Sequence, residues 1–542
     1  MLAASKWAPT AALRGRFLAI PVTESTTNDV DLVSLAREGA SPTPKWVKVV
    51  DQTKCIGCHA CTTACKSEND VPLSVTRTYV KSVDIGRFPS VRRAFQVTRC
   101  NQCDDAPCVT ACPTSAMFRR GDGIVDFDKS ACIGCKACMA ACPYDAIFIN
   151  PEDHSAEKCN FCAHRLDVGL EPACVVVCPT EALLVGDIND PTSKVAQIVN
   201  REPVNVRRPD KETKPKLFYK GAHQATLDPL AARRPEGGLF MWSEQSAGPG
   251  EAPSGHPRRN NSSAAALLSY DVTHRMPWDW RVSLYTWTKA IAAGAYLAPL
   301  IAALAGFLAW DNALWRWGAP ALALTFLAIT GAVLIGDLEH PKRFHYLFLR
   351  PQWRSWLVRG AVVIAAYGGV LTLHLIFSAA GAVEPQKWLA VIGLPLAVAT
   401  AAYTAYLFAQ AKARDLWQSP LLGPHMVVQA VMVGAAVSVL VAEWVADGAV
   451  DGLLWLLAGT SVAHLAAVLG ETTLPHPTAH AHLAVWELVR GRYAAYFWAA
   501  AVLIIVSVFA PLIGIAAAPL ALVGLLAYEH AYVQAGQVVP LA

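Results

Sequence analysis

The cysteines of this chain fall into four short runs, and no cysteine lies outside them. The runs are Cys55/Cys58/Cys61/Cys65, Cys100/Cys103/Cys108/Cys112, Cys132/Cys135/Cys138/Cys142 and Cys159/Cys162/Cys174/Cys178. In a run spaced C-x2-C-x2-C-x3-C, three thiolates surround one [4Fe–4S] cluster and the fourth reaches a second cluster. The first and third runs have this spacing, whereas the second contains a gap of four residues and the fourth a gap of eleven. Because a cubane takes four thiolates, the 16 cysteines predict four [4Fe–4S] clusters, which form a path for single electrons.

Zinc and disulfides are the alternatives for these cysteines. Pairs spaced C-x2-C also bind zinc, but a zinc site needs two pairs and has no use for a third cysteine two residues further on. Disulfides are disfavoured because such close spacing strains a bridge. No secretory signal indicates an oxidising compartment, since the first residues lack a twin-arginine pair and their apolar stretch is interrupted by Arg14 and Arg16. We expect these first residues to form a short extension.

The second half of the chain has a different composition. Hydrophobic residues make up 54% of the chain, and from about residue 282 onwards they form long runs rich in Ala, Leu and Val. Eight apolar segments are each about long enough to cross a hydrocarbon layer of ~30 Å. Their approximate limits are residues 284–309, 319–337, 356–379, 388–410, 421–443, 452–470, 494–514 and 516–533. A large buried helical core is the alternative, and it is disfavoured because these segments leave almost no amphipathic surface for water.

The fold class expected from these patterns is an α+β double ferredoxin-like iron–sulfur domain followed by an all-α polytopic membrane domain of eight transmembrane helices. Short strands are expected between the cysteine runs, at Ile124–Asp128 and Ala146–Ile149. The expected domains are an N-terminal extension (1–45), a four-cluster domain (46–240), a linker (241–280) and a membrane anchor (281–542).

The loops between the apolar segments predict the topology. Loops after the second, fourth and sixth segments carry eight basic residues: Lys342, Arg343, Arg350, Arg354, Lys412, Arg414, Arg490 and Arg492. The loops on the other side carry only Arg316 and Lys387. Since basic loops stay in the cytoplasm, we expect a multi-pass protein of the inner (cytoplasmic) membrane whose iron–sulfur domain faces the cytoplasm. The formal net charge of +4 is too small to indicate a nucleic-acid partner.

The cysteine block resembles the four-cluster iron–sulfur subunits of the complex iron–sulfur molybdoenzymes, such as dimethyl sulfoxide and polysulfide reductases. The matching stretches are CIGCHACTTACKSENDVP, RCNQCDDAPCVTACPTSAMF, DGIVDFDKSACIGCKACMAACPYDAIFI and CNFCAHRLDVGLEPACVVVCPTEAL. The resemblance implies that the runs exchange ligands. The implied ligand sets are Cys55/Cys58/Cys61/Cys178, Cys65/Cys159/Cys162/Cys174, Cys100/Cys103/Cys108/Cys142 and Cys112/Cys132/Cys135/Cys138. It also implies that the first cluster lies nearest a separate catalytic subunit and the cluster held by Cys112 nearest the membrane.

The apolar half resembles the eight-helix polysulfide-reductase membrane-anchor family. The matching stretches are SLYTWTKAIAAGAYL, DLEHPKRFHYLFLRPQWRSWLVRGA, AYTAYLFAQAKARDLWQSPLL and YVQAGQVVPLA. These two modules are usually separate chains, so this sequence is similar to a natural fusion of both. The resemblance implies a quinone site on the cluster side of the membrane, to which a tyrosine of the fourth helix contributes.

Polar residues within apolar segments are costly, about 2.5–3.5 kcal/mol for a central charge, so each suggests a functional role. The candidates lie near the predicted cytoplasmic ends of six segments: Lys289, Asp337, Arg359, Tyr403, Tyr406, His425, Gln429 and Glu471. We expect Tyr403 and His425 to hydrogen-bond a quinone, and Asp337 and Glu471 to exchange protons with it.

Structural explanations are open for several of these candidates and their neighbours. Asp337 and Arg359 could form an interhelical ion pair, and Lys289 could extend to the membrane surface. Gln429 and His464 could be satisfied helix–helix hydrogen bonds. His374 and Glu443 lie near the opposite face, where they could belong to a proton path or be structural.

The sequence therefore predicts an electron-transfer and membrane-anchor subunit with four [4Fe–4S] clusters. It would connect a cytoplasmic molybdopterin catalytic subunit to menaquinone or ubiquinone in the lipid bilayer. The substrate of the partner and the direction of electron flow stay open. An ion-translocating quinone-linked module and a subunit of a hydrogenase are the alternatives.

Overall fold

The computed structural model describes residues 43–87, 89–233 and 265–542. Almost all of the expected N-terminal extension, and residues 241–264 of the expected linker, lie outside the described residues. Two regions follow each other along the described chain, and we call them the cysteine domain (described residues from 44 to 272) and the helical domain (residues 278–542).

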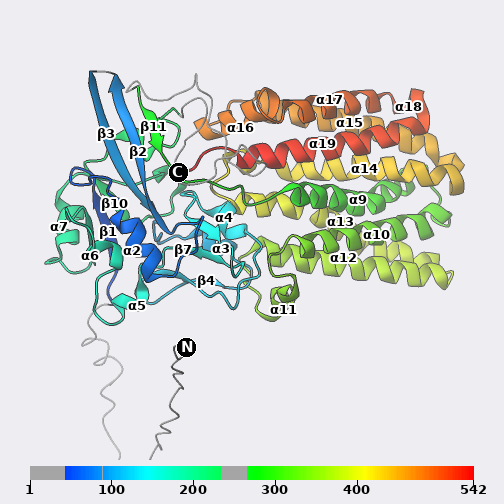
Figure 1. Ribbon diagram of the computed structural model, residues 1–542. Helices are drawn as coiled ribbons and strands as arrows, with labels where there is room; N and C mark the ends of the chain where they lie inside the picture. The colour runs from blue at the N-terminus through cyan, green and yellow to red at the C-terminus, as the bar shows by residue number, and fades with distance from the viewer. Residues whose placement is uncertain (1–42, 88, 234–264) are drawn as a thin grey trace, which may run out of the picture. The chain divides into compact units, whose positions relative to one another are not determined.

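The cysteine domain consists of short helices and strands between the cysteine runs (Figure 1). Its strands are β1 Trp46–Asp51, β2 Thr78–Arg87, β3 Ser90–Arg99, β4 Met117–Arg119, β5 Val125–Phe127, β6 Ile147–Ile149, β7 Ala156–Lys158, β8 Leu183–Asp187, β9 Val204–Asn205, β10 Leu217–Lys220 and β11 Leu267–Tyr270. Its helices are α2 Ala60–Glu68, α3 Pro107–Ala111, α4 Ala137–Ala141, α5 Ala163–Leu166, α6 Ala173–Val176, α7 Lys194–Arg201, η1 Pro209–Lys211 and α8 Gln224–Leu227. The two expected strands are confirmed as β5 and β6.

Strand pairing brings distant cysteine runs together. In the sheet of order β8-β1-β10-β9, β1 is antiparallel to β8, with Val50 opposite Leu183. Cys55 follows β1 and Cys178 precedes β8, so the paired strand ends place the first run beside the fourth. The middle runs are joined differently, because α3 and α4 contact each other and each is followed by a two-stranded hairpin, β4–β5 or β6–β7.

The expected linker contains a strand in its described part. β11 adds to the sheet of order β11-β2-β3, where Leu267 pairs with Asp84 of β2. β2 and β3 form a ten-residue antiparallel ladder from Thr78–Arg99 to Arg87–Ser90. Residues 267–270 therefore belong to the cysteine domain and return the chain to it before the first long helix begins.

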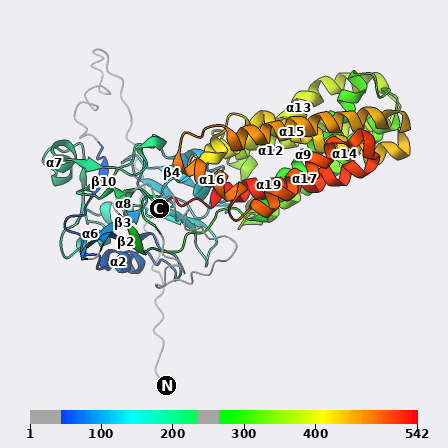
Figure 2. The same ribbon diagram turned by 90° about the horizontal axis from the view of Figure 1, so that it is seen from above.

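The helical domain consists of long helices that run side by side in both views (Figures 1 and 2). The elements are α9 Trp280–Leu304, η2 Leu314–Gly318, α10 Ala319–Gly336, η3 Pro341–Arg343, α11 Tyr346–Leu349, α12 Trp356–Ala379, α13 Val383–Gln410, η4 Asp415–Gln418, α14 Leu422–Val445, η5 Asp447–Ala449, α15 Val450–Thr473, α16 Ala479–Val489, α17 Ala494–Val508, α18 Ala510–Ile513, η6 Gly514–Ala516 and α19 Ala517–Gln537.

Among the described residues, seven helices are long and apolar enough to cross a membrane. An eighth span results if α16 and α17, which are bent by 67° at their junction, are counted as one. The expected segment 494–514 corresponds to α17, which has only 15 residues. Large apolar side chains such as Val391, Trp455 and Leu512 are exposed on the outer surface of the helices. An exposed apolar surface of this extent requires a lipid environment, so this is a multi-pass membrane protein.

Helices α9 and α14 form the interior of the helical domain. They are the most enclosed of the long helices, because 83% and 72% of the residues in their most apolar stretches are buried. Two glycines allow the helices to touch, because a Cβ on Gly294 would lie 1.8 Å from the carbonyl oxygen of Ala430. A Cβ on Gly434 would lie 2.1 Å from the carbonyl oxygen of Gly294. Small residues at such crossings let helix backbones approach closely within a membrane.

Gly294→Ala should therefore destabilise the protein, because the added methyl group must push α9 away from α14. Overpacking of this kind typically costs about 1–3 kcal/mol. The measurement is the thermal unfolding midpoint of the purified protein in mild detergent. Gly331→Ala on α10 is the matched control, since a Cβ there meets nothing within 4 Å. Equal midpoints for the two variants would contradict the close α9–α14 crossing.

Candidate functional site

The first and fourth cysteine runs supply two groups of neighbouring thiols. Cys55 interacts electrostatically with Cys58 and Cys178, and Cys61 interacts with Cys174, Cys55 and Cys178. Cys65 of the same helix, α2, lies instead beside three cysteines of the fourth run, Cys159, Cys162 and Cys174. The first run is thus divided between two groups.

The second and third runs are divided in the same way. Cys108 interacts with Cys100, Cys103 and, from the third run, Cys142. Cys112 leaves its own run and interacts with Cys132, Cys135 and Cys138. These last four cysteines line one common cavity. These groups are compatible with the ligand sets implied by the family resemblance, which stay a prediction.

The donor atoms fit iron–sulfur clusters. Burial raises the pKa of the Cys61 thiol to about 11 and that of Cys65 to about 12. Thiols of this kind stay protonated at neutral pH unless a bound metal supplies positive charge, as iron does. Among the described residues, no three His, Cys, Asp or Glu side chains converge closely enough for a single metal ion. A cubane is larger than one ion and accepts ligands that stand further apart.

Arg99 provides positive charge between the first and fourth runs. Burial raises the pKa of the Cys174 thiol, but the charges of Arg99 and Lys48 outweigh this effect and lower the pKa to about 7. The Nη1 atom of Arg99 also donates a hydrogen bond to Cys174 Sγ at 3.0 Å. Backbone N–H groups supply similar bonds elsewhere, from Ala182 to Cys178 Sγ at 3.2 Å and from Met117 to Cys112 Sγ at 3.4 Å. Hydrogen bonds to the sulfurs are one of the factors that set a cluster's potential.

The helical domain contacts the backbone of the third cysteine run. The indole of Trp278 donates to the carbonyl oxygen of Cys135 at 3.2 Å, and Nη1 of Arg343 donates to that of Cys132 at 2.8 Å. The N–H of Glu339 donates to the carbonyl oxygen of Gly134 at 3.4 Å. A Cβ on Gly134 would clash with Glu339, and its φ of +70° favours glycine as well.

The second run is held by the residues just before α12. The hydroxyl of Ser355 donates to the carbonyl oxygen of Ala111 at 2.8 Å, and the N–H of Gln352 donates to that of Pro113 at 2.9 Å. We call the contacts made by Trp278 and residues 337–355 to the second and third runs the cluster clamp. It places the cysteine group of Cys112 beside the ends of α9, α10 and α12.

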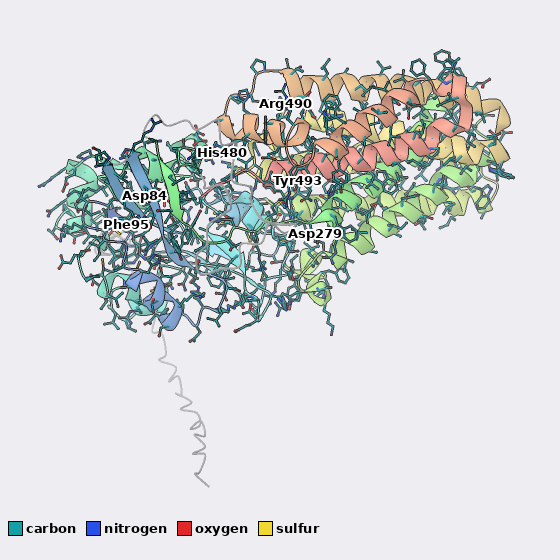
Figure 3. The ribbon with its side chains drawn as sticks, turned by 45° about the horizontal axis from the view of Figure 1, so that its top comes forward. Asp84, Phe95, Asp279, His480, Arg490 and Tyr493 are labelled. Carbon is teal, nitrogen blue, oxygen red and sulfur yellow. The ribbon has the colours of Figure 1, made fainter. Side chains whose placement is uncertain are left out.

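Charged residues form a second contact between the two domains. Asp415 pairs with Lys211 and lies 3.7 Å from Arg208, and it accepts a hydrogen bond from Thr478 at 2.6 Å. The Nη1 atom of Arg208 lies 3.1 Å from Nε2 of His480, which is labelled at the start of α16 in Figure 3. Separately, His274, in the segment that joins the two domains, lies 2.6 Å from Asp145 and 3.2 Å from Asp271, both of the cysteine domain. Although burial lowers its pKa, the two carboxylates outweigh burial and raise the pKa to about 9.

Two polar groups inside the helical domain contain buried candidate residues. The first, which we call the central polar group, comprises Tyr285, Lys289, Tyr403, Thr404 and Glu529 from α9, α13 and α19. The ammonium of Lys289 donates to the carbonyl oxygen of Ala401 and to Thr404 Oγ1, both at 2.7 Å, and lies 5.0 Å from the ring centroid of Tyr403. Glu529 interacts electrostatically with Lys289. Tyr285 interacts with Tyr403 and with Asp337.

The second group is a hydrogen-bonded series of side chains from α14, α15 and α19, which we call the histidine network. Nδ1 of His425 lies 3.0 Å from Glu471 Oε1, and Nε2 of His425 lies 2.8 Å from Nδ1 of His464. The hydroxyl of Tyr528 donates to Glu471 Oε2 at 2.8 Å. Both ring nitrogens of His425 therefore have protein partners, and neither is left for a ligand.

The candidate residues of the membrane half do not form one cluster. Lys289 and Tyr403 lie in the central polar group, and His425 and Glu471 lie in the histidine network. Asp337 lies 3.5 Å from Lys136 of the cysteine domain, within the cluster clamp. Arg359 donates to the carbonyl oxygen of Trp353 at 2.8 Å. Tyr406 is half exposed and stacks on Trp356 at 4.4 Å between ring centroids.

The remaining residues considered from the sequence take separate positions. His374 lies in α12 with Nδ1 3.3 Å from the Tyr296 hydroxyl. Glu443 is exposed, and Gln429 is buried in α14. Sequence reasoning missed Tyr285, Tyr528 and Glu529, which lie inside two of the expected apolar segments. A glutamate in an apolar segment is itself a signal, and counting every such carboxylate would have identified Glu529.

Comparison with known proteins agrees with this architecture. The model of the polysulphide reductase family NrfD matches residues 269–540, which is half of the chain. This protein belongs to the NrfD polysulphide reductase family. The model of a 4Fe-4S dicluster domain matches residues 91–188.

The cysteine domain has close relatives among reductase subunits. It is 43% identical to the B subunit of the tetrathionate reductase of Salmonella typhimurium over 201 residues, 36% of this chain and 80% of that protein. The B component of the polysulfide reductase of Wolinella succinogenes is 44% identical over 177 residues, 32% of this chain and 93% of that protein. The arsenate respiratory reductase iron-sulfur subunit ArrB of a Shewanella species is 36% identical over 219 residues, 32% of this chain and 94% of that protein. The protein is therefore an iron–sulfur electron-transfer subunit fused to an NrfD-type membrane anchor.

The grouping of cysteines from the two middle runs makes a prediction about iron content. Four cubanes hold about 16 iron atoms, and Cys112→Ala should remove up to about four. Adding Cys135→Ala should remove no more iron, because both thiols belong to one group. Adding Cys103→Ala to Cys112→Ala should remove about four more, since Cys103 belongs to another group.

Anaerobic iron analysis of the purified variants measures this difference. Cys142→Ala is the matched control. Combined with Cys103→Ala it should remove no more iron than either change alone, whereas combined with Cys135→Ala it should remove about four more iron atoms. The opposite pattern in both pairs would mean that each run holds its own cluster.

Proposed function

We propose that the chain carries electrons between a catalytic subunit and the membrane quinone pool through four [4Fe–4S] clusters. The four cysteine groups described above would provide all 16 ligands, in a cysteine domain of double ferredoxin-like fold spanning about residues 46–240. Each cluster supplies one-electron transfer when it is bound. The helical domain, about residues 281–542, would cross the membrane eight times if α16 and α17 together form one span.

The partner is proposed to be a molybdopterin-containing subunit on the cytoplasmic side. The reductase names of the relatives support a separate catalytic chain, and the basic loops support the orientation. Lys342, Arg343, Arg350 and Arg354 precede α12 on the same side as the cluster clamp. Positively charged loops stay in the cytoplasm, which favours a cytoplasmic cysteine domain in the inner membrane.

A series of electrostatic interactions from the cluster clamp into the membrane carries the proposal of a quinone site. Cys135 interacts electrostatically with Asp337, Asp337 with Tyr285, and Tyr285 with Tyr403 of the central polar group. This series leads from the cysteine group nearest the helices to buried polar side chains between α9 and α13. An electron leaving the clamp thus has a polar site within the bilayer at which a quinone can be reduced.

Lys289 and Tyr403 are the proposed quinone contacts. An ammonium has three N–H donors, and Lys289 uses two of them on Ala401 and Thr404. Its third donor can bind a quinone carbonyl oxygen, and the Tyr403 hydroxyl can bind the same or the second oxygen. The low-polarity surroundings strengthen both bonds, since little water competes for the donors.

Tyr403→Phe should lower the rate of quinone reduction about two- to tenfold, because one hydrogen bond contributes about 0.5–1.5 kcal/mol. Reduction of the clusters by a reduced viologen dye should be unchanged, since the cysteine domain is untouched. The measurement is stopped-flow absorbance of the clusters and of a soluble quinone analogue, with purified protein in detergent.

Tyr367→Phe is the matched control, because the buried Tyr367 on α12 donates only to the carbonyl oxygen of Ala292 at 3.0 Å. Tyr406→Phe separates the two candidate tyrosines of α13. Loss of quinone reduction in Tyr406→Phe, with Tyr403→Phe normal, would move the site to the exposed α12–α13 surface.

A further inference from the structure

Electron transfer to a quinone requires protons that the clusters do not carry. Reduction of one quinone to quinol takes up two electrons and two protons, one on each oxygen, and oxidation releases them. The central polar group is buried between α9, α13 and α19, so water cannot deliver these protons directly. A set of titratable side chains that connects this group with the protein surface is therefore required by the proposed quinone site.

Glu529 connects the two polar groups of the helical domain. Its carboxylate is 3% exposed and interacts electrostatically with Lys289 on one side and with His425 and Glu471 on the other. Its Oε2 atom is buried without a hydrogen-bond partner among the described residues. A buried carboxylate that is left partly unsatisfied costs free energy, which a purely structural role does not explain.

The histidine network lies between Glu529 and the end of α15. Nδ1 of His425 lies 3.0 Å from Glu471, so the ring can exchange a proton with this carboxyl group, while Nε2 of the ring is bonded to His464. Tyr528 fixes the carboxylate of Glu471 through a hydrogen bond, and His464 fixes the ring of His425. Glu471 is 5% exposed and lies in the last turn of α15.

His476 connects Glu471 with water. It lies in the loop between α15 and α16, is partly exposed, and interacts with the backbone of Glu471 and with the charge of its carboxylate. Its ring contacts that of His482, which is exposed, at 5.6 Å between centroids. Burial lowers the pKa of His476, so in most molecules the ring is neutral at pH 7 and can accept a proton. The same loop contains Thr478, which donates a hydrogen bond to Asp415 at the contact between the two domains. The loop therefore lies on the side of the cysteine domain.

We propose that Glu529, His425, Glu471 and His476 form a proton path between the quinone site and water on the cluster side of the membrane. This path rests on the proposed quinone site. For each quinol formed, two electrons arrive from the clusters, and two protons pass in turn from Glu529 to the Lys289–Tyr403 site. Each proton lost by Glu529 is replaced from water through His476, Glu471 and His425. In quinol oxidation the same groups carry two protons outwards.

Glu529→Gln and Glu471→Gln test the path because glutamine keeps the shape of glutamate and cannot transfer a proton. Each should slow quinone reduction at least about tenfold, towards the ~100-fold that a positioned acid–base group contributes. The solvent deuterium isotope effect on the rate should increase in both variants, because proton delivery becomes the slow step. Cluster reduction by viologen and the affinity for an inhibitory quinone analogue should remain as in the wild type.

Glu487→Gln is the matched control. Glu487 is equally buried, at 5% exposure in α16, but it is bonded to the N–H of Arg492 outside the path. It should change neither the rate nor the isotope effect. His476→Ala should slow quinone reduction, and added imidazole should restore the rate, which a structural defect would not allow.

Infrared difference spectra of the protein, recorded on reduction of the bound quinone in H2O and D2O, provide an independent readout. A carboxyl C=O band that shifts in D2O should be present in wild type and in Glu487→Gln and absent in Glu529→Gln. Unchanged rates, isotope effects and spectra in the two path variants would overturn the proton path while leaving the quinone site intact. A wild-type protein whose clusters are reduced but never reduce quinone would instead overturn the quinone site itself.

Discussion

The cluster clamp is the interaction on which the rest of the molecule depends. Electrons leave the cysteine domain only if its last cluster stays close to the membrane helices, and the clamp fixes this distance through main-chain atoms. Trp278, Arg343 and Ser355 donate hydrogen bonds to carbonyl oxygens within or beside the second and third cysteine runs. Main-chain atoms of a cluster-binding loop cannot move far without displacing the thiolates, so these hydrogen bonds hold the two domains at a fixed distance. Covalent fusion supports the same arrangement, because β11 leads the chain from the cysteine domain directly to Trp278 and α9.

The position of the clamp gives a reason for the polar side chains that are buried inside the helical domain. Burying Lys289, His425, Glu471 and Glu529 is costly in a membrane, and the cost is tolerated where these groups bind one another or a substrate. In the proposed function, charge interactions join these separate groups into a series that begins at Asp337 beside the clamp. The close crossing of α9 and α14 at Gly294 and Gly434 brings Lys289 and His425, one turn or more from these glycines, into the same layer. The proposed routes of electrons and protons would thus meet at one depth in the bilayer.

Much of this architecture can be predicted from the sequence, for physical reasons that differ between the two halves. Cysteine spacing specifies clusters because thiolates must stand at fixed intervals, and the apolar segments specify membrane helices because the bilayer demands a fixed length. The membrane site was predicted less well. Asp337, Arg359 and Tyr406 share the depth of Lys289 and Tyr403, but depth alone does not specify which face of a helix meets which neighbour. Glu529 was missed for the related reason that its partners, Lys289 and His425, lie on helices far away in the sequence. The bend between α16 and α17 left no periodic signal, so the count of eight spans stays a prediction.

The central claim is that electrons pass from the cluster of Cys112, Cys132, Cys135 and Cys138 to a quinone at the central polar group. A cryo-electron microscopy map of the purified protein with a bound quinone analogue tests it most directly, since both the iron atoms and the headgroup are visible. The account predicts a headgroup between α9 and α13 that contacts Lys289 and Tyr403, with this cluster nearest to it. A headgroup bound elsewhere, for example beside Tyr296 and His374, or a different cluster nearest to it, would contradict the account.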